Sequence, residues 1–566
     1  MRHSPARPAL ILSALFAGAA IAGVGLRADS KDRPDPSSKA DAPAADVHRS
    51  PIALALSADG SKLLSANQTA GSVSLIDTAD GLVFAEIKTG EKPAGVALSA
   101  DGKLGVVTHW YGYDLAILKV GADSLEVVGR VEVVPEPRGV VLGADGQTAY
   151  VAVGVRNEVV RVDLDAEEVT GRVEVGREPR GIALSPDGSK LLVGNSRASN
   201  LSVIDVEAFE VERTLPIQGV NLRQVAIDPD GQTGYVANMQ NRGMATTQRN
   251  IDLGWVLGQR LTKVALDASE DFSTLSLDPQ GHAVSDAHGM AVSPDGKYLA
   301  VSCGGTAEVL LFRTDMDRLP WRYGGARDLI HYELLSDDGR FRRVETGGRP
   351  TELAFAPDGK TLYVANYLED FVQVIDAEAG EVVRAINLGG PVELSLARRG
   401  EVLFHDATRS VNQWYSCNTC HSDGHTNGDL FDTRNDGWQD LSSLPKYSKK
   451  AVPTLRGVTR TGPWTWHGWQ ESIEDAMIES FTVSMQGQRP TDEEVRAIVV
   501  YLDTLEHPPN PYLEPDGRLS EAAERGREVF RSPKAACNTC HSGPEFTDGR
   551  IHIVGTEDRR RDVYEG

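Results

Sequence analysis

One short turn recurs at a fixed period through the first four hundred residues, and this period decides the fold class. Each copy ends in Asp-Gly, a dipeptide typical of tight hairpins, and the aspartates stand at positions 59, 101, 145, 187, 230, 295 and 358. Successive gaps are 42, 44, 42, 43, 65 and 63 residues, so the last two exceed one period by about 20 residues each. The sequence therefore predicts seven copies of one unit, two of which carry insertions.

Each unit contains four short apolar phrases separated by turn residues. In the last unit these phrases include residues 350–355, 363–366, 375–376 and 381–386. Four strands in roughly 42 residues are typical of one propeller blade, and a closed ring of blades leaves no long sheet edge exposed. The phrases resemble the YVTN-type β-propeller repeat over residues 47–395. The resemblance implies an all-β seven-bladed propeller.

The predicted propeller contains no nucleophile–base pair and no metal-ligand spacing, so we expect a scaffold and docking surface. His109, His282 and His288 are scattered, and Cys303 lies in a strand pattern as a buried, inert thiol. The two insertions, at about 239–286 and 314–346, are candidate contacts with the rest of the chain or with a partner. They carry Trp255, Trp321 and a basic cluster: Arg313, Arg318, Arg322 and Arg327.

Four of the five cysteines fall in two identical pentapeptides, Cys-Asn-Thr-Cys-His. C-x-x-C-H is the attachment signature of c-type haem, because two thiols bond to the vinyl groups and the next imidazole binds the iron. A thioredoxin-like pair would not require the histidine, and half a zinc site would not require the same helix before each motif. The sequence thus predicts two covalently bound c-type haems. The attachment thiols are Cys417, Cys420, Cys537 and Cys540, and the proximal ligands are His421 and His541.

The region after the repeats is expected to be helical. Residues 491–494 form a capping-box pattern, and apolar residues then follow at helical spacing up to Leu505. Met485 lies just before this helix and is the first choice for the sixth iron ligand of the first haem, with His467 second. The alternative for Met485 is an ordinary core methionine.

Three phrases of this region carry a resemblance to the bacterial di-haem cytochrome c peroxidase superfamily, which includes methylamine-dehydrogenase-maturation enzymes. They lie at 403–406, 452–458 and 462–468, and the resemblance runs from about residue 398 to the end. It implies mainly α cytochrome c domains after the propeller. Two departures bear on peroxidase activity: residues 435–439 lack the expected distal histidine, and Met485 is flanked by Ser484 and Gln486 where the family has a glutamate.

Peroxide cleavage needs a general acid–base near the iron, so these departures leave the catalytic residues unassigned. Glu471, Glu474 and His467 are the remaining local candidates, although an exposed helix face explains the two glutamates more simply. Five of the eight tryptophans surround the first motif, and either packing against the macrocycle or electron hopping accounts for them. These tryptophans are Trp414, Trp438, Trp464, Trp466 and Trp469.

The ends and linkers indicate an exported chain. Residues 1–28 have the pattern of an export signal, with an uncleaved anchor as the alternative, and a disordered linker follows at 29–46. We expect a first cytochrome c domain at 396–506, a Pro-rich linker at 507–519 and an incomplete second domain at 520–566. Because only 25 residues follow His541, roughly 60 to 100 further residues are expected beyond Gly566.

Together these features predict a periplasmic di-haem redox protein that transfers electrons, with peroxidase-like or substrate-oxidising activity as an open extension. The expected partner is a redox protein or a small-molecule oxidant or substrate. The alternative is a partner-docking propeller whose haems only relay electrons. The formal net charge of −23 argues against nucleic acid, and no stable transmembrane domain is expected in the mature chain.

Overall fold

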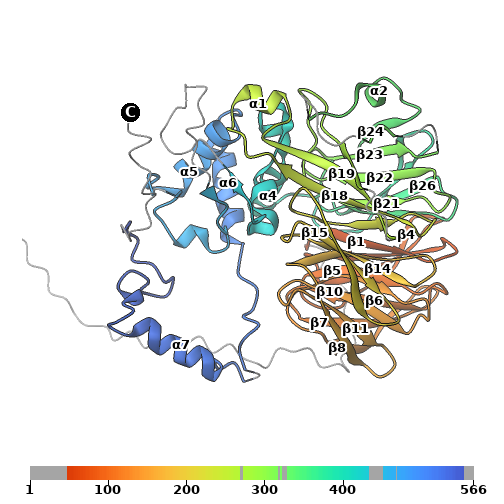
Figure 1. Ribbon diagram of the computed structural model, residues 1–566, viewed down its shortest axis with the longest axis horizontal. Helices are drawn as coiled ribbons and strands as arrows, with labels where there is room; N and C mark the ends of the chain where they lie inside the picture. Colours follow the sequence, from red (N-terminus) through yellow and green to blue (C-terminus); the bar gives the residue numbers. More distant parts are fainter. Residues whose placement is uncertain are drawn as a thin grey trace, which may run out of the picture.

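The computed structural model describes residues 47–267, 272–315, 319–321, 328–431, 450–466, 468–514 and 516–552 (Figure 1). Several sequence predictions lie outside these residues. They are the export signal, the 29–46 linker, the 435–439 segment with Trp438, His467, and the arginines at 318, 322 and 327.

The repeats form seven four-stranded antiparallel sheets, which confirms the seven-bladed propeller. The strands of blades one to four are β1 (Pro51–Leu56), β2 (Lys62–Asn67), β3 (Ser72–Asp77), β4 (Leu82–Lys88), β5 (Pro93–Leu98), β6 (Leu104–His109), β7 (Asp114–Val120), β8 (Leu125–Glu132), β9 (Pro137–Leu142), β10 (Thr148–Val153), β11 (Glu158–Asp163), β12 (Glu168–Glu174), β13 (Pro179–Leu184), β14 (Lys190–Asn195), β15 (Asn200–Asp205) and β16 (Glu210–Pro216). Blades five to seven contain β17 (Val225–Ile227), β18 (Thr233–Asn241), β19 (Leu257–Ala265), β20 (Phe272–Ser276), β21 (Ala287–Val292), β22 (Tyr298–Cys303), β23 (Glu308–Arg313), β24 (Phe341–Glu345), β25 (Pro350–Phe355), β26 (Thr361–Asn366), β27 (Phe371–Asp376) and β28 (Glu381–Asn387).

The repeated turn builds each blade in the same way. In blade one, the Asp59 carboxylate accepts hydrogen bonds from the Ser57 hydroxyl at 2.6 Å and from the Ser61 amide at 3.0 Å. Gly60 follows at φ 74°, where a glycine is favoured. The second and third strands of the blade are almost wholly buried, whereas β4 alternates between exposed and partly buried residues. The cores therefore lie between neighbouring blades, and β4 forms the outer rim.

The ring closes without an exchanged strand, because blade seven is completed by β28. We call the junction between blades seven and one the seam. Asp370 joins its two sides, accepting a hydrogen bond from the Ser50 amide at 2.7 Å and lying 2.5 Å from His48 Nδ1. Arg398, beyond the propeller, reaches the same place: its Nη2 donates to the Tyr367 carbonyl at 2.7 Å and lies 3.6 Å from Asp370.

The two predicted insertions fall largely inside blades rather than between them. The first places α1 (Gln248–Asp252) between β18 and β19, and the second places α2 (Tyr332–Leu335) between β23 and β24. Trp321 of the second insertion stacks on Tyr235 of β18 at 6.3 Å between ring centroids and so packs between blades five and six. Cys303 is fully buried, as expected from its strand pattern.

Helices alternate with irregular segments after the propeller, so this region is less helical than the expected mainly α domains. Its elements are α3 (Leu396–His405), η1 (Ala407–Arg409), η2 (Val411–Gln413), α4 (Cys417–Cys420), η3 (Ser422–Gly424), β29 (Leu430–Phe431), β30 (Lys450–Ala451), η4 (Val458–Arg460), α5 (Ile473–Glu479), the π-helix η5 (Ser480–Ser484), α6 (Asp492–Asp503), α7 (Glu521–Arg531) and η6 (Cys537–Thr539). Figure 1 shows α4, α5 and α6 at one end of the propeller and α7 apart from them. None of the helices in the described ranges is long and apolar enough to cross a membrane.

Candidate functional site

The first pentapeptide opens onto a cavity of about 410 Å³, here called the Cys417 cavity. Cys417, Cys420 and His421 line it together with Met485. The other walls are mainly apolar and aromatic, and include Phe404, Tyr415, Leu455, Val458, Trp464, Trp466, Ile473, Met477, Ile498 and Leu502. A cavity of this size and polarity suits a flat, largely apolar cofactor.

The His421 ring is oriented by the main chain. Its Nδ1 lies 2.9 Å from the carbonyl oxygen of Pro453, which only a protonated Nδ1 can bond. The other ring nitrogen, Nε2, then carries the lone pair, and burial lowers the pKa of the ring to about 4. His421 is therefore a neutral imidazole, which is the form that binds a metal.

Met485 is 1% exposed and lines the same cavity. It follows the π-helix η5, and its amide donates to the Ser480 carbonyl at 2.9 Å. A widened turn of this kind often occurs at functional sites. The side chain also packs in an apolar cluster with Trp414, Phe481 and Ile498, so the structure brings Met485 to the cavity in a position that serves either ligation or packing.

The thiols at this site are poorly suited to disulfide redox chemistry. Burial raises the pKa of Cys417 to about 12 and raises that of Cys420 as well. A thioredoxin-like cysteine needs the opposite shift, because the thiolate is the reactive form. Across the described ranges there is also no group of three or more His, Cys, Asp or Glu side chains that could hold zinc.

No carboxylate lines the Cys417 cavity among the described residues. Glu471 and Glu474 are both exposed; Glu474 lies on α5, as expected, whereas Glu471 precedes the N-cap residue Ser472. Gln486 points toward the propeller, where its Nε2 donates to the Thr246 carbonyl at 3.3 Å. The described part of the cavity therefore offers no carboxyl group as a general acid–base.

A buried aspartate of the propeller holds the first pentapeptide. Asp286, just before β21, accepts hydrogen bonds from Ser416 Oγ at 2.7 Å, Thr419 Oγ1 at 2.6 Å and Asn418 Nδ2 at 3.2 Å. Asn418 and Thr419 are fully buried, whereas the two cysteines between which they stand line the cavity. The motif thus presents its thiols to the cavity and its polar side chains to blade six. Sequence reasoning missed this contact, which joins residues 130 to 133 positions apart.

A second contact lies on the propeller axis. Asp423, two residues after His421, lies 2.6 Å from Arg180 Nη1, 3.1 Å from Arg223 Nη1 and 3.8 Å from Arg138 Nη1. These arginines hold the pKa of the Asp423 carboxyl well below its usual range, although its burial opposes that shift. The sequence did carry a signal here, because Arg138 and Arg180 follow a proline at the same point of successive repeats.

The first insertion also contacts this region. Asn412 Nδ2 donates to Asp252 Oδ1 at 2.6 Å, and Asn241 Nδ2 donates to the Leu430 carbonyl at 2.9 Å. Trp414 is 6% exposed and packs in the apolar cluster that also holds Ile251 of α1. The predicted contact of the first insertion is therefore present, and packing accounts for Trp414.

The second pentapeptide shares one feature with the first. His541 Nδ1 lies 3.1 Å from the Phe546 carbonyl, just as His421 bonds to Pro453. Its surroundings differ: α7 contains no buried residue, and apolar side chains nearby are exposed. These are Val529, Phe546 and Ile551. Cys537 and Cys540 are partly exposed.

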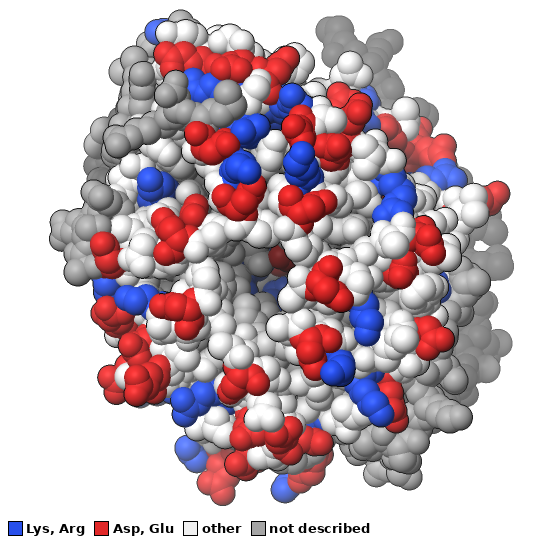
Figure 2. All heavy atoms as spheres, turned by 90° about the vertical axis from the view of Figure 1, so that its right-hand side faces the viewer, with Lys and Arg blue, Asp and Glu red and all other residues white. Residues whose placement is uncertain are grey.

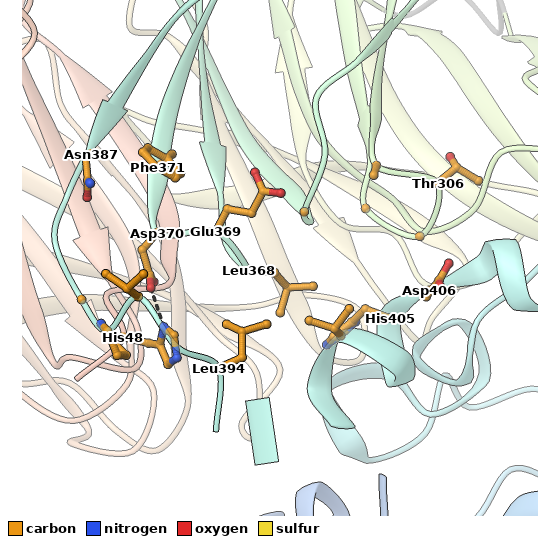
Figure 3. Close-up of a pocket in the computed structure, with 18 of the residues that line it drawn as sticks. His48, Thr306, Leu368, Glu369, Asp370, Phe371, Asn387, Leu394, His405 and Asp406 are labelled. Carbon is orange, nitrogen blue, oxygen red and sulfur yellow. Dashed lines mark hydrogen bonds and ion pairs between the residues drawn. The ribbon is translucent and has the colours of Figure 1, made fainter. Parts of the chain in front are cut away.

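A larger cavity of about 570 Å³ lies at the seam, between blade seven and α3 (Figure 3). Leu368 and Leu394 lie between the His48–Asp370 pair and His405 in this view. His405 Nδ1 is buried without a hydrogen-bond partner among the described residues, and burial holds the ring pKa well below its usual value. The cavity contains no arrangement that assigns it a reaction.

No family model matches the chain. It is 30% identical over 176 residues to hydrazine synthase subunit gamma of Kuenenia stuttgartiensis, covering 29% of this chain and 50% of that protein. It is 22% identical over 206 residues to cytochrome-c peroxidase IdrP2 of Pseudomonas sp. (strain SCT), covering 30% and 52%. The chain thus spans about half the length of these curated relatives.

Among solved structures, a chain of Kuenenia stuttgartiensis hydrazine synthase superposes with a TM-score of 0.53 and 26% identity, covering 58% of this chain and 96% of that one. With the fold, these similarities define a class: a seven-bladed propeller protein similar to hydrazine synthase and to a cytochrome-c peroxidase.

Proposed function

We propose that the chain is a periplasmic c-type cytochrome that carries two covalent haems and transfers electrons, with the propeller as the scaffold for the first haem. The observation that carries the proposal is the convergence of Cys417, Cys420, His421 and Met485 on one apolar cavity. The similarity to a cytochrome-c peroxidase is consistent with it.

Haem, when bound, supplies a reversible one-electron couple at its iron. Cys417 and Cys420 would hold it by thioether bonds, and Nε2 of His421 and the sulfur of Met485 would bind its iron. The Pro453 carbonyl keeps the proton on Nδ1 of His421. The apolar lining and the absence of a carboxyl group among the described wall residues favour electron transfer over substrate chemistry at this position.

The second pentapeptide extends the proposal to Cys537, Cys540 and His541. No sixth ligand is assigned there, so this position is where a peroxidase-like or substrate-oxidising activity would reside. The partner is a redox protein or a small oxidant, and the relatives named as hydrazine synthase suggest that it works within an assembly. A docking role for the propeller has no observation of its own beyond the contacts already described.

The test is a haem count in purified, exported protein. We expect two covalent haems in the wild type, one complete attachment fewer in Cys417→Ala and in Cys537→Ala, and two in Cys303→Ala, the matched control. Intact mass and haem staining report the count. An optical and electron paramagnetic resonance spectrum then tests the assignment of roles: the first iron should be low-spin. Full attachment in either pentapeptide variant contradicts the proposal.

A further inference from the structure

The axial channel of the propeller ends in buried arginines next to the first pentapeptide. Residues in or beside the first strand of all seven blades line it, and it encloses about 110 Å³. Asp423 reaches into one end from the cytochrome region. Figure 2 shows the opposite face of the propeller, where the channel opens at the centre and both basic and acidic groups are visible inside. The channel is therefore connected to solvent on the side away from α4.

Positive charge exceeds negative charge in this channel. Four arginines line it, at positions 138, 180, 223 and 349, and the described lining contains two carboxyl groups, Asp423 and Glu352. Burial raises the pKa of Glu352 to about 8, so this group is mostly neutral at pH 7. Outside the lining, Glu178 pairs with both Arg180 and Arg197 and so balances only one of them. Asp423 is left as the counter-ion of several guanidinium groups.

Arg349 shows the excess of positive charge in the channel most directly. It is 5% exposed, lines the channel and forms no ion pair or side-chain hydrogen bond with any described residue. Its one recorded contact is the face of Tyr367, 5.0 Å away, which does not neutralise the charge. Arg138 Nε and His288 Nδ1 are likewise buried without a partner in the described chain. His288, expected to be satisfied or solvent-facing, thus belongs to this unsatisfied group.

Arg223 also lies close to other positive charges. Burial and the neighbouring Arg180 lower its pKa to about 10, and the same two causes act on Arg138. An unpaired charge in a partly desolvated site costs free energy, so a channel lined by an excess of guanidinium groups favours the binding of an anion. Guanidinium groups bind oxyanions through two parallel hydrogen bonds. The channel encloses about 110 Å³ and therefore has room for a small oxyanion.

We propose that the channel binds one small inorganic oxyanion, of the size of nitrate or sulfate, between the guanidinium groups of Arg223 and Arg349. The anion lies beside Asp423, in the same loop as His421. Because it supplies a second counter-ion to the arginines, it stabilises the contact between the propeller and the first pentapeptide.

The test is equilibrium dialysis of the full-length protein against radiolabelled sulfate. Ionic strength is held with sodium gluconate, whose anion is too large for the channel. We expect saturable binding of one sulfate per chain, displaced by unlabelled nitrate. Arg349→Gln should weaken the affinity at least tenfold. Lys103→Gln, which removes one charge from a 77% exposed side chain of the propeller, should leave it unchanged.

Circular dichroism checks that each variant is folded. If Arg349→Gln does not fold, Arg349→Lys carries the test, because it keeps the charge but loses the paired hydrogen bonds, and we expect a several-fold weaker affinity. No saturable sulfate binding in the wild type overturns the proposal. So does equal binding by whichever Arg349 variant folds.

Discussion

Replacement of Asp286 by alanine should loosen the first pentapeptide from the propeller. The carboxylate accepts three hydrogen bonds from buried donors on Ser416, Asn418 and Thr419. Hydrogen bonds to a charged group contribute about 1.5 to 3 kcal/mol each, and they do not add fully. The buried Asn418 amide would lose its acceptor, and the hydroxyls of Ser416 and Thr419 would keep only each other and Ser285. We therefore expect a loss of about 3 to 5 kcal/mol in the local stability of α4.

Native-state hydrogen exchange measures this loss directly, because a multidomain chain does not unfold in one step. At 1.4 kcal/mol per factor of ten, the amides of α4 should exchange roughly 100 to 3,000 times faster in Asp286→Ala. Amides of blades two and three should keep their rates. In Asp286→Asn, the exchange rates of α4 should lie between those of the wild type and those of Asp286→Ala. The amide side chain presents one acceptor oxygen, whereas the carboxylate presents two.

The matched control is Asp295→Ala, which removes a carboxylate of the same blade that bonds only to Ser293 and Lys297. It should leave the exchange of α4 unchanged. If Asp286→Ala exchanges within threefold of the wild type at α4, the reasoning about this contact is wrong.

Three further outcomes are expected. Met485→Ala should abolish the weak long-wavelength ferric band of a methionine-ligated haem and lower its potential, whereas Met477→Ala, in the same cavity, should keep both; an unchanged spectrum in the first variant would exclude Met485 as a ligand. The pKa of Glu352 rises from 4.5 to about 8 on folding, so its contribution to stability is full below pH 4.5 and is lost as pH rises toward 8. Urea unfolding at several pH values should therefore show a decline of at most roughly 1.4 kcal/mol per pH unit that Glu352→Gln lacks. Arg398→Met leaves the Glu401 carboxylate without its buried partner and removes one of several contacts of Asp370. It should cost about 3 to 5 kcal/mol and speed exchange in both α3 and β1; acceleration in α3 alone would argue against a role at the seam.

The propeller could be predicted because its information is local and repeated. Each Asp-Gly turn fixes one hairpin, and seven turns at nearly equal spacing leave few alternatives to a ring. The insertions were found as extra length, but their positions inside blades five and six depend on which strand is interrupted. The repeat period alone does not show which strand is interrupted.

Sequence alone could identify only those site residues that belong to a short, recognisable motif. Cys417 and His421 are recognisable because they belong to a Cys-x-x-Cys-His motif of five consecutive residues. Asp286 is not, because an isolated aspartate before a strand acquires its role only when blade six meets α4. The arginines of the channel could be predicted only in part. Arg138 and Arg180 stand at equivalent points of the repeat, but only ring closure brings them together with Arg349.

The way the ring closes has a consequence for how the molecule comes apart. In a propeller without an exchanged strand, the chain does not run across the junction between the last and the first blade, and here Asp370 joins the two sides of that junction. Arg398 of α3 binds both Asp370 and Tyr367, so the helix that leads to the first pentapeptide also fastens that junction. Undocking the cytochrome region therefore removes a fastener from the ring, and opening the ring removes a support from the cytochrome region. The propeller and the cytochrome region are therefore expected to come apart together under force. Force applied to the C-terminal side should separate blades one and seven before any other two neighbouring blades.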